Sequence, residues 1–339
     1  SKIPEVKSTC SVKHLRLAKL NLIPLDTFGF ARGNMVLELR GKTIRELHGK
    51  LTLSDAMYAN AHDSLFLDSM VLTDDLIKDG HDITIKSKLF NANLIGSTSL
   101  YDLPYAFMKV ANHYMPTYFD LIDMTDPDTM QAFDFEIEVK NDADLISLVS
   151  KELKIKQSLK VTGRLNTVGN NFLLNSDTTN WSIGSAHFVR NSIQIYPTKN
   201  DLVVKTSAEA VKLSDNFMLE NFTGIADVRH DSVVTSFNWL NETELSDSGL
   251  VNLTLYRTPD VPWNVMLNTL NVRIAGVQWT SKKKAQLHAD SNQLSVNDLE
   301  LASETGRITC SGMLNQHAKS NLYFIVKDLN MNYLSNFGV

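Results

Sequence analysis

The sequence predicts a mostly β protein, in which an elongated, curved antiparallel β-sheet carries one or two short helices. Runs of alternating apolar and polar residues recur along the chain, and FDFEIEVK at 133–140 shows the pattern most clearly. Side chains on a strand point alternately to opposite faces, so such a run predicts a strand with one wet and one apolar face. Asn, Asp, Ser and Gly separate the runs, as in hairpin turns. Helical periodicity is confined to two short stretches, and strands without crossover helices between them are typically antiparallel.

Strand-like runs follow one another along the whole chain, and we expect them to form one elongated section over residues 1–339. Up to residue 210 the clearest runs are KLTLS at 50–54, LFLDSMVL at 65–72, ITIKS at 83–87, SLKVTGRL at 158–165, SIQIY at 192–196 and DLVVKT at 201–206. Beyond it they are SVVTSFNWL at 232–240, GLVNLTLY at 249–256, TLNVRIAGVQW at 269–279, AQLHADS at 285–291, LSVNDLELAS at 294–303, RITCSGML at 307–314 and NLYFIVKDLNM at 321–331.

The two helical stretches are predicted near 103–115 and near 142–153. Asp102 precedes Leu103 and Pro104, which is a helix-start pattern with proline in the first turn, and Pro116 ends the run. In DADLISLVSKEL at 142–153 the apolar residues fall on one helical stripe. We expect both helices to pack against the sheet as local caps.

A loose repeat places a glycine inside successive strands, as in LHGKLTLSD, LIGSTSLYD, VTGRLNT, FTGIADVR, IAGVQWTS and CSGMLNQ. A glycine within a strand typically marks a bulge, a bend or a close backbone approach. Roughly 20 strands spaced about 4.8 Å apart would make an open sheet on the order of 90 to 100 Å long. Open sheets rarely exceed about ten strands without curling or splitting into two layers. The chain is therefore expected either to curl into a trough or to form two stacked sandwiches.

Composition excludes several classes of function. The 339 residues carry a formal net charge of −5 with Lys and Arg scattered singly, so no basic stripe for nucleic acid is present. The lysine cluster at 282–284 is interpreted as a solvated turn. No apolar run approaches the roughly 20 residues of a membrane-spanning helix. Cys10 and Cys310 are interpreted as small buried residues, with a single long-range disulfide as the alternative.

Signatures of catalysis, metal binding and phosphate binding are absent from the sequence. The HExxH, GxSxG, GxxxxGK[ST] and GxGxxG motifs are missing. Three His-Asp dipeptides begin at His62, His81 and His230, and all three are interpreted as turns because neighbouring strand residues face opposite ways. Asp134, Glu136 and Glu138 share one side of their strand, the side expected to be wet. We therefore expect no enzymatic activity, no metal and no cofactor.

Apolar side chains on one phase of the strands are the most informative feature. A packed sandwich core would explain them without any ligand, and a greasy groove is the alternative. The candidates for lining such a groove are Phe133, Phe135, Ile137, Val139, Leu159, Val161, Trp181, Ile183, Ile193, Ile195, Phe237, Trp239, Leu253, Leu255, Val272, Ile274, Leu299 and Leu301, with Trp279 as a further aromatic candidate.

Residues 40–210 resemble the periplasmic region of the TamB family of translocation and assembly modules, in the AsmA-like superfamily. The similarity lies in GKLTLSDAMYANAHDSLFLDSMVLTDD at 49–75, in HDITIKSKLFNANLIGSTSLYDLPYAFMKVANHYMP at 81–116 and in the stretch from FDFEIEVK to NNFLLNSD at 133–177. In both, Leu-rich hairpins lead to a strand with an internal glycine, a short proline-started helix and an alternating strand that begins Phe-x-Phe. The remainder of the chain agrees only in style.

The resemblance implies a taco-shaped hydrophobic groove in the periplasm of a bacterial envelope, with phospholipid acyl chains as its cargo. It also implies an inner-membrane anchor before this section and an outer-membrane barrel of the TamA type beyond it, neither of which is visible in the sequence. A hydrophobic conduit for phospholipid between the two membranes is thus the expected function. Two alternatives stay open: a scaffold or chaperone for outer-membrane protein assembly, and a surface adhesin or glycan-binding β protein.

Overall fold

The computed structural model is mostly β, as the sequence predicts. It describes residues 3–16, 29–59, 64–119, 130–140, 152–214, 217–242, 247–258, 261–274, 276–289, 292–304, 306–316 and 319–328. Within these residues 22 strands form a single antiparallel sheet, and there is one α-helix. The chain divides into two compact units: unit 1 holds residues 1–112 and 119–184, and unit 2 holds residues 113–118 and 185–339. The curvature of the sheet and its groove stay predictions.

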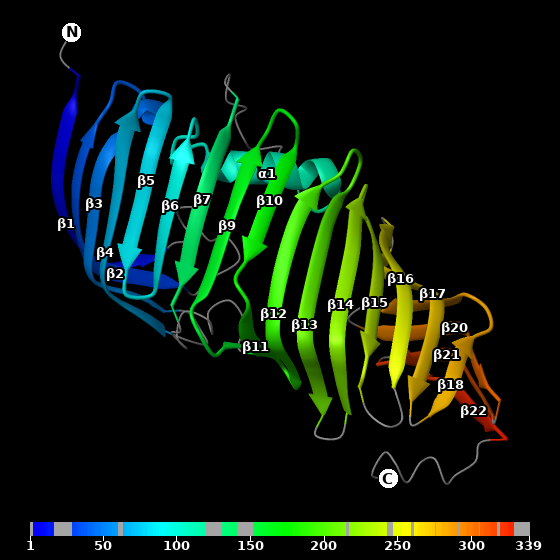
Figure 1. Cartoon of the computed structure of the whole chain (residues 1–339). Helices are drawn as coiled ribbons and strands as arrows, with labels where there is room; N and C mark the ends of the chain where they lie inside the picture. Colours follow the sequence, from blue (N-terminus) through cyan, green and yellow to red (C-terminus); the bar gives the residue numbers. More distant parts are fainter. Residues whose placement is uncertain are drawn as a thin grey trace. The chain divides into compact units, whose positions relative to one another are not determined.

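Unit 1 is a meander of antiparallel strands (Figure 1). Strands β1 to β7 pair in chain order, β7 then pairs with β9, β9 pairs with β10, and β8 pairs with β11. The strands are β1 (Glu5–Arg16), β2 (Phe30–Arg40), β3 (His48–Ala59), β4 (Ser64–Ile77), β5 (Gly80–Ser87), β6 (Phe90–Gly96), β7 (Ala132–Val139), β8 (Leu153–Ile155), β9 (Leu159–Asn166), β10 (Asn171–Ser176) and β11 (Thr179–Ile183).

Unit 2 continues the meander pattern. Strands β12 to β17 pair in chain order, β18 and β19 each pair with both β17 and β20, and β21 and β22 follow. The strands are β12 (Ala186–Pro197), β13 (Leu202–Ser214), β14 (Phe217–Arg229), β15 (Ser232–Leu240), β16 (Ser248–Thr258), β17 (Val261–Ile274), β18 (Val277–Ser281), β19 (Ala285–Ala289), β20 (Gln293–Ser303), β21 (Gly306–Asn315) and β22 (Tyr323–Lys327).

Helix α1 (Leu103–Tyr114) forms where the sequence predicts it and packs against the sheet of unit 1. The Phe107 ring lies 5.6 Å from the ring of Phe133 in β7 and 6.2 Å from that of Phe172 in β10. Ala106 and Val110 are buried in this contact region. The second helix is predicted near 142–153; residues 141–151 lie outside the described residues, and Leu153 begins strand β8 instead of ending a helix.

Four glycines within strands lie opposite an aromatic residue of the neighbouring strand. The registered pairs are Gly96 with Phe133, Gly163 with Phe135, Gly224 with Phe237, and Gly249 with Trp239. A methyl group added to any of these glycines would press against that aromatic side chain. Gly163, Gly224 and Gly249 are therefore close-approach sites that make room for aromatic rings, whereas a Cβ on Gly96 would meet the Ala132 carbonyl oxygen and the Cα and Cβ of Phe133.

Bulges arise mostly at other residues. Asp55, Arg190, Asn221 and Asp298 have positive φ angles of 50°, 48°, 49° and 62° inside their strands. The register shifts by one residue at Val12–Leu15, at Ser54–Met57 against β2, at Leu267–Thr269 and at Val296–Leu299, so a bulge adds a residue at each of these places, and the next apolar side chain can come three positions later and still point to the same face. Steps of three run from Val12 to Leu15, Leu267 to Leu270 and Val296 to Leu299, and they also occur opposite one another with the register kept, at Leu53–Ala56 with Leu67–Met70 and at Ala208–Val211 with Leu219–Phe222.

Three sequence-based expectations need correction. TLNVRIAGVQW forms two strands, because β17 ends at Ile274 and β18 begins at Val277, and only 323–327 of NLYFIVKDLNM is described as strand. His81 belongs to β5 and not to a turn, because the hairpin turn occupies the two residues before Gly80. The turn at His230 is confirmed, whereas that at His62 lies outside the described residues. Cys10 and Cys310 are both free, Cys310 is buried, and Cys10 is only half-buried.

Candidate apolar ligand-binding face

The candidate site in unit 1 is one face of its sheet, which we call the apolar face of unit 1. It bears Phe133, Phe135, Ile137 and Val139 of β7 and the side chains in register with them. Residues paired across an antiparallel ladder point to the same side. Leu159 and Val161 of β9 pair with Val139 and Ile137, so these six predicted residues share one face. Through β6, β5, β4 and β3 the same face continues over Leu94, Ile83, Leu72, Leu51 and Leu53.

An apolar hollow lies on this face at the bulged ends of β1 to β4. It has a volume of about 310 Å³. The bulge at Asp55 allows Leu53 and Ala56 to line the same hollow, and Gly33 of β2 leaves room there, since a Cβ on it would lie 2.9 Å from the Ala56 Cα. The other lining residues are Val12, Leu15, Ala31, Arg32, Met35, Met57, Tyr58, Leu65 and Leu67.

The face is covered at one end and open at the other. Phe133 is 4% exposed and Phe135 is 7% exposed, because α1 and the ring of Phe172 pack against them. Ile137 and Val139, further along the same strand, are only half-buried. The sequence places all four residues in one open trough. The structure puts the two phenylalanines in a packed aromatic cluster instead.

Trp181 and Ile183 lie in β11, whose register with β8 pairs them with Ile155 and Leu153. Trp181 is half-buried and Ile183 is exposed. Their position in unit 1 is therefore set by the short β8–β11 pair, and the pairing of β7 with β9 does not put them in register with Phe133 and its neighbours.

In unit 2 the predicted residues also share one face, here called the apolar face of unit 2. Phe237 stands opposite Gly224 of β14 and Val251 of β16, so these residues point to the same side of the sheet. The same step from strand to strand extends this face from β12 to β21. Val272 pairs with Trp279, so the further aromatic candidate lies on this face as well. A buried cluster of Ala208, Val211, Leu219 and Phe222 packs against Phe237 and Trp239. The predicted residues on this face are Ile193, Ile195, Phe237, Trp239, Leu253, Leu255, Val272, Ile274, Leu299 and Leu301.

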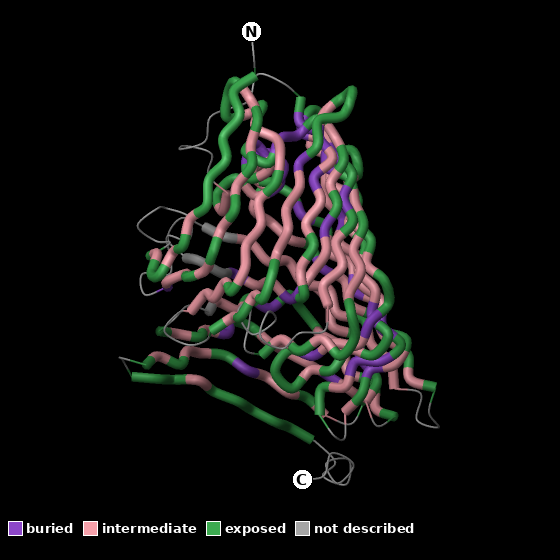
Figure 2. Tube along the Cα trace, turned by 90° about the vertical axis from the view of Figure 1, so that its left-hand side faces the viewer, coloured by how far each residue is buried: buried purple, intermediate pink, exposed green. Residues whose placement is uncertain are grey.

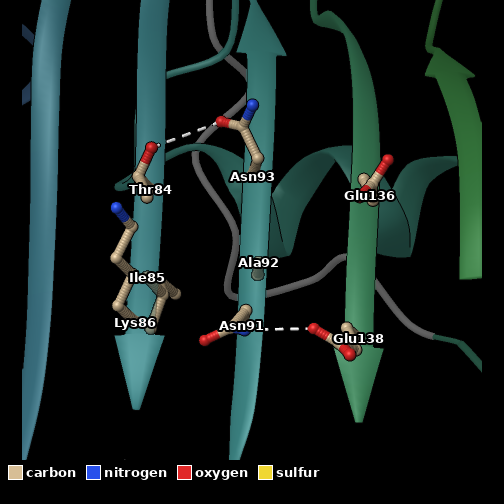
Figure 3. A pocket seen from close by; sticks show the side chains of 8 residues that line it. All are labelled: Thr84, Ile85, Lys86, Asn91, Ala92, Asn93, Glu136 and Glu138. Carbon is tan, nitrogen blue, oxygen red and sulfur yellow. Dashed lines mark hydrogen bonds between the residues drawn. The ribbon is translucent and has the colours of Figure 1, made fainter. Parts of the chain in front are cut away.

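The opposite face of β5, β6 and β7 is polar (Figure 3). Asn91 donates a hydrogen bond to Glu138 at 3.1 Å, and Lys160 lies 2.8 Å from Glu136. Arg164 donates hydrogen bonds from Nε and Nη2 to the two carboxylate oxygens of Asp134 and holds the pKa of that carboxyl below its usual range. The carboxylates of FDFEIEVK are thus engaged in cross-strand pairs on a solvated face, as the sequence predicts, and a paired, wet carboxylate is a poor general acid.

One buried polar pair was missed from the sequence. His81 Nδ1 lies 2.7 Å from Asp74 Oδ1, and both residues sit on the apolar face of unit 1 among Leu72, Ile83 and Leu94. The signal was available, because Asp74 follows Met70 and Leu72 on the apolar phase of β4.

Two further features limit the chemistry of the described residues. Among them, no three His, Cys, Asp or Glu side chains are grouped so that they could hold a metal ion. None of their helices has the length and apolar content needed to cross a membrane.

Comparison with known proteins adds no relative: no protein-family model, no curated protein and no solved structure matches this chain.

Proposed function

We propose that the chain is a non-enzymatic, periplasmic carrier of phospholipid acyl chains, part of a conduit between the inner and outer membranes of a bacterial envelope. The observation that supports this most directly is the apolar hollow at the ends of β1 to β4. Its lining residues are apolar except for Arg32 and the hydroxyl group of Tyr58. They are half-buried, apart from Arg32, which is exposed. Pockets of about 300 to 1,000 Å³ hold small ligands, so the hollow has room for part of an acyl chain.

The energetics favour a surface of this kind. Burying a methylene is worth about 0.8 kcal/mol, so a chain of about 16 carbons has on the order of 12 kcal/mol at stake when it leaves a bilayer. An apolar strip that continues over several strands recovers part of this free energy without forming any bond. In this proposal the bulges matter because they keep the strip unbroken: without the step of three, the apolar residues beyond each bulge would turn to the solvated face.

A charge placed in the hollow tests the proposal. Met35→Glu puts a carboxylate among the lining residues, whereas Val36→Glu puts the same group on the opposite face of β2, where Val36 is exposed. We expect purified wild-type protein and Val36→Glu to retain phospholipid detectable by mass spectrometry, and Met35→Glu to lose it. Equal lipid content in the two variants, or none in the wild type, would contradict the proposal.

The second candidate function is a scaffold for outer-membrane proteins that binds extended segments at a strand edge. Strand β22 favours it, because Tyr323 to Val326 are exposed and, within the described part of the chain, β22 pairs with β21 alone (Figure 2). An uncovered apolar edge is a template for strand addition. Replacing Tyr323 and Ile325 together with Lys should abolish capture of an unfolded outer-membrane barrel protein and leave retained lipid unchanged. Loss of retained lipid with unchanged capture of the barrel protein would favour the conduit.

A further inference from the structure

Asp74 of β4 and His81 of β5 form a buried polar pair on a face that is otherwise apolar. Their side chains are 4% and 9% exposed, and the 2.7 Å between Asp74 Oδ1 and His81 Nδ1 requires a proton between the two atoms. His81 lies in the same cross-strand row as Gly96 and Phe133, and the Phe133 ring contacts Phe107 of α1, while Asp74 lies in the neighbouring row with Ile83.

In the register of the sheet neither side chain stands opposite another polar residue. Asp74 stands between Gly49 and Ile83, and its second oxygen, Oδ2, is buried without a hydrogen-bond partner among the described residues. His81 stands between Leu76 and Gly96. Glycine and apolar side chains offer no further donor, so a negative charge on Asp74 is only partly compensated.

Burial therefore raises the pKa of Asp74, and the hydrogen bond and charge of His81 offset this only in part. His48 of β3 and Asp75 of β4 are the other ionisable groups that act on it: His48 lowers the pKa and Asp75 raises it. Asp75 points to the opposite, solvated side of β4, as expected for the adjacent residue of a strand.

We propose that Asp74, buried against His81, is a proton-binding site that takes up a proton as the medium becomes acidic and thereby removes a negative charge from the apolar face of unit 1. The folded protein binds this proton more tightly than the unfolded chain does. The contribution of Asp74 to stability is consequently largest when the pH is below the ordinary aspartate pKa of 3.8. It is lost as the pH rises through the raised pKa that Asp74 has in the folded state. The inference stands independently of the proposed lipid function, because it requires no ligand.

Urea unfolding of the full chain between about pH 8 and pH 5 tests the pair. We expect the midpoint of the wild type to rise relative to that of Asp74→Asn as the pH falls. The shift should amount to roughly 0.5 M for each pH unit below the raised pKa of the folded state. Asp75→Asn is the matched control, because it removes the same charge one residue away and should follow the wild-type trend. Parallel curves for the wild type and Asp74→Asn would overturn the proposal.

A second measurement keeps the test decisive if Asp74→Asn fails to fold. Infrared spectra of protein labelled with ¹³C-Asp report the carbonyl band of a protonated carboxyl group directly. We expect this band in the wild type and in Asp75→Asn at a pH above the ordinary pKa of aspartate. Its absence from both proteins would refute proton uptake by Asp74.

Discussion

Gly224→Ala tests whether the strand glycines make room for aromatic side chains. Gly224 lies in β14 between Thr206 of β13 and Phe237 of β15. A Cβ at this position would lie 2.8 Å from the Thr206 Cγ2 and 3.1 Å from the Phe237 ring. Overpacking of this kind costs about 1 to 3 kcal/mol, and the lower entropy of the unfolded alanine chain offsets about 0.4 to 1 kcal/mol. We expect a net loss of about 1 to 2 kcal/mol, measured by urea unfolding.

A double-mutant cycle assigns the loss to the ring. Phe237→Leu removes the aromatic edge, so Gly224→Ala should cost less in that background, with a coupling energy of about 1 kcal/mol. Gly169→Ala is the control, because its Cβ would meet only the side chain of Asn171, which is exposed and free to move. If Gly224→Ala costs no more than Gly169→Ala, or the same in both backgrounds, the close-approach explanation is wrong.

Two further predictions concern the packing of unit 1 and of unit 2. Phe133→Ala should lose about 3 to 5 kcal/mol of unfolding free energy, because its ring is buried against Phe107, whereas Val139→Ala on the open part of the same strand should lose much less. A similar loss in both would show that α1 does not cover the face as described. In unit 2, Asp231 accepts hydrogen bonds from the Thr117 amide at 2.9 Å and from the Thr117 hydroxyl at 2.8 Å. Asp231→Gly removes both bonds but tolerates the φ of 60°, so it should lower the free energy of unfolding by about 1 kcal/mol. Asp231→Asn should lower it by less. Thermal unfolding that is unchanged in Asp231→Gly would contradict this.

The strand pattern and the apolar phase were predictable from the sequence because both depend on local alternation. Phe237 and Trp239 illustrate this: a period of two placed them on one face, and the register confirms that they share it with Leu253 and Val272. Alternation says nothing of what covers that face. The burial of Phe133 by α1 therefore became visible only in the structure, since it depends on a helix that ends at Tyr114, well before the strand begins at Ala132.

Cross-strand partners were beyond sequence reasoning for a related reason. His81 was judged with its chain neighbour Asp82, yet its partner is Asp74, which is brought close by the two-residue turn of the β4–β5 hairpin. A hairpin register must be known before such a pair can be recognised. The alternation within β4 alone did mark Asp74 as unusual, because Asp74 occupies a position where the pattern requires an apolar residue. A carboxylate at such a position is either buried with the apolar side chains or exposed where the strand is irregular.

Asp55→Val tests the role of the bulges in keeping the apolar face continuous. Asp55 has a φ of 50°, a conformation that aspartate tolerates and a β-branched residue does not, so the variant should lose about 1 to 2 kcal/mol. If the bulge is lost while the chain keeps its length, Ala56 and Tyr58 move to the solvated face and the hollow loses two of its walls. Asp55→Gly, which adopts this φ freely, should retain both stability and binding of a fluorescent fatty-acid probe. Asp68→Val is the control on the paired strand, where φ is ordinary. Because the same step of three recurs in strands of both units, normal probe binding by Asp55→Val would mean that the bulges serve local twist and not the continuity of an apolar surface.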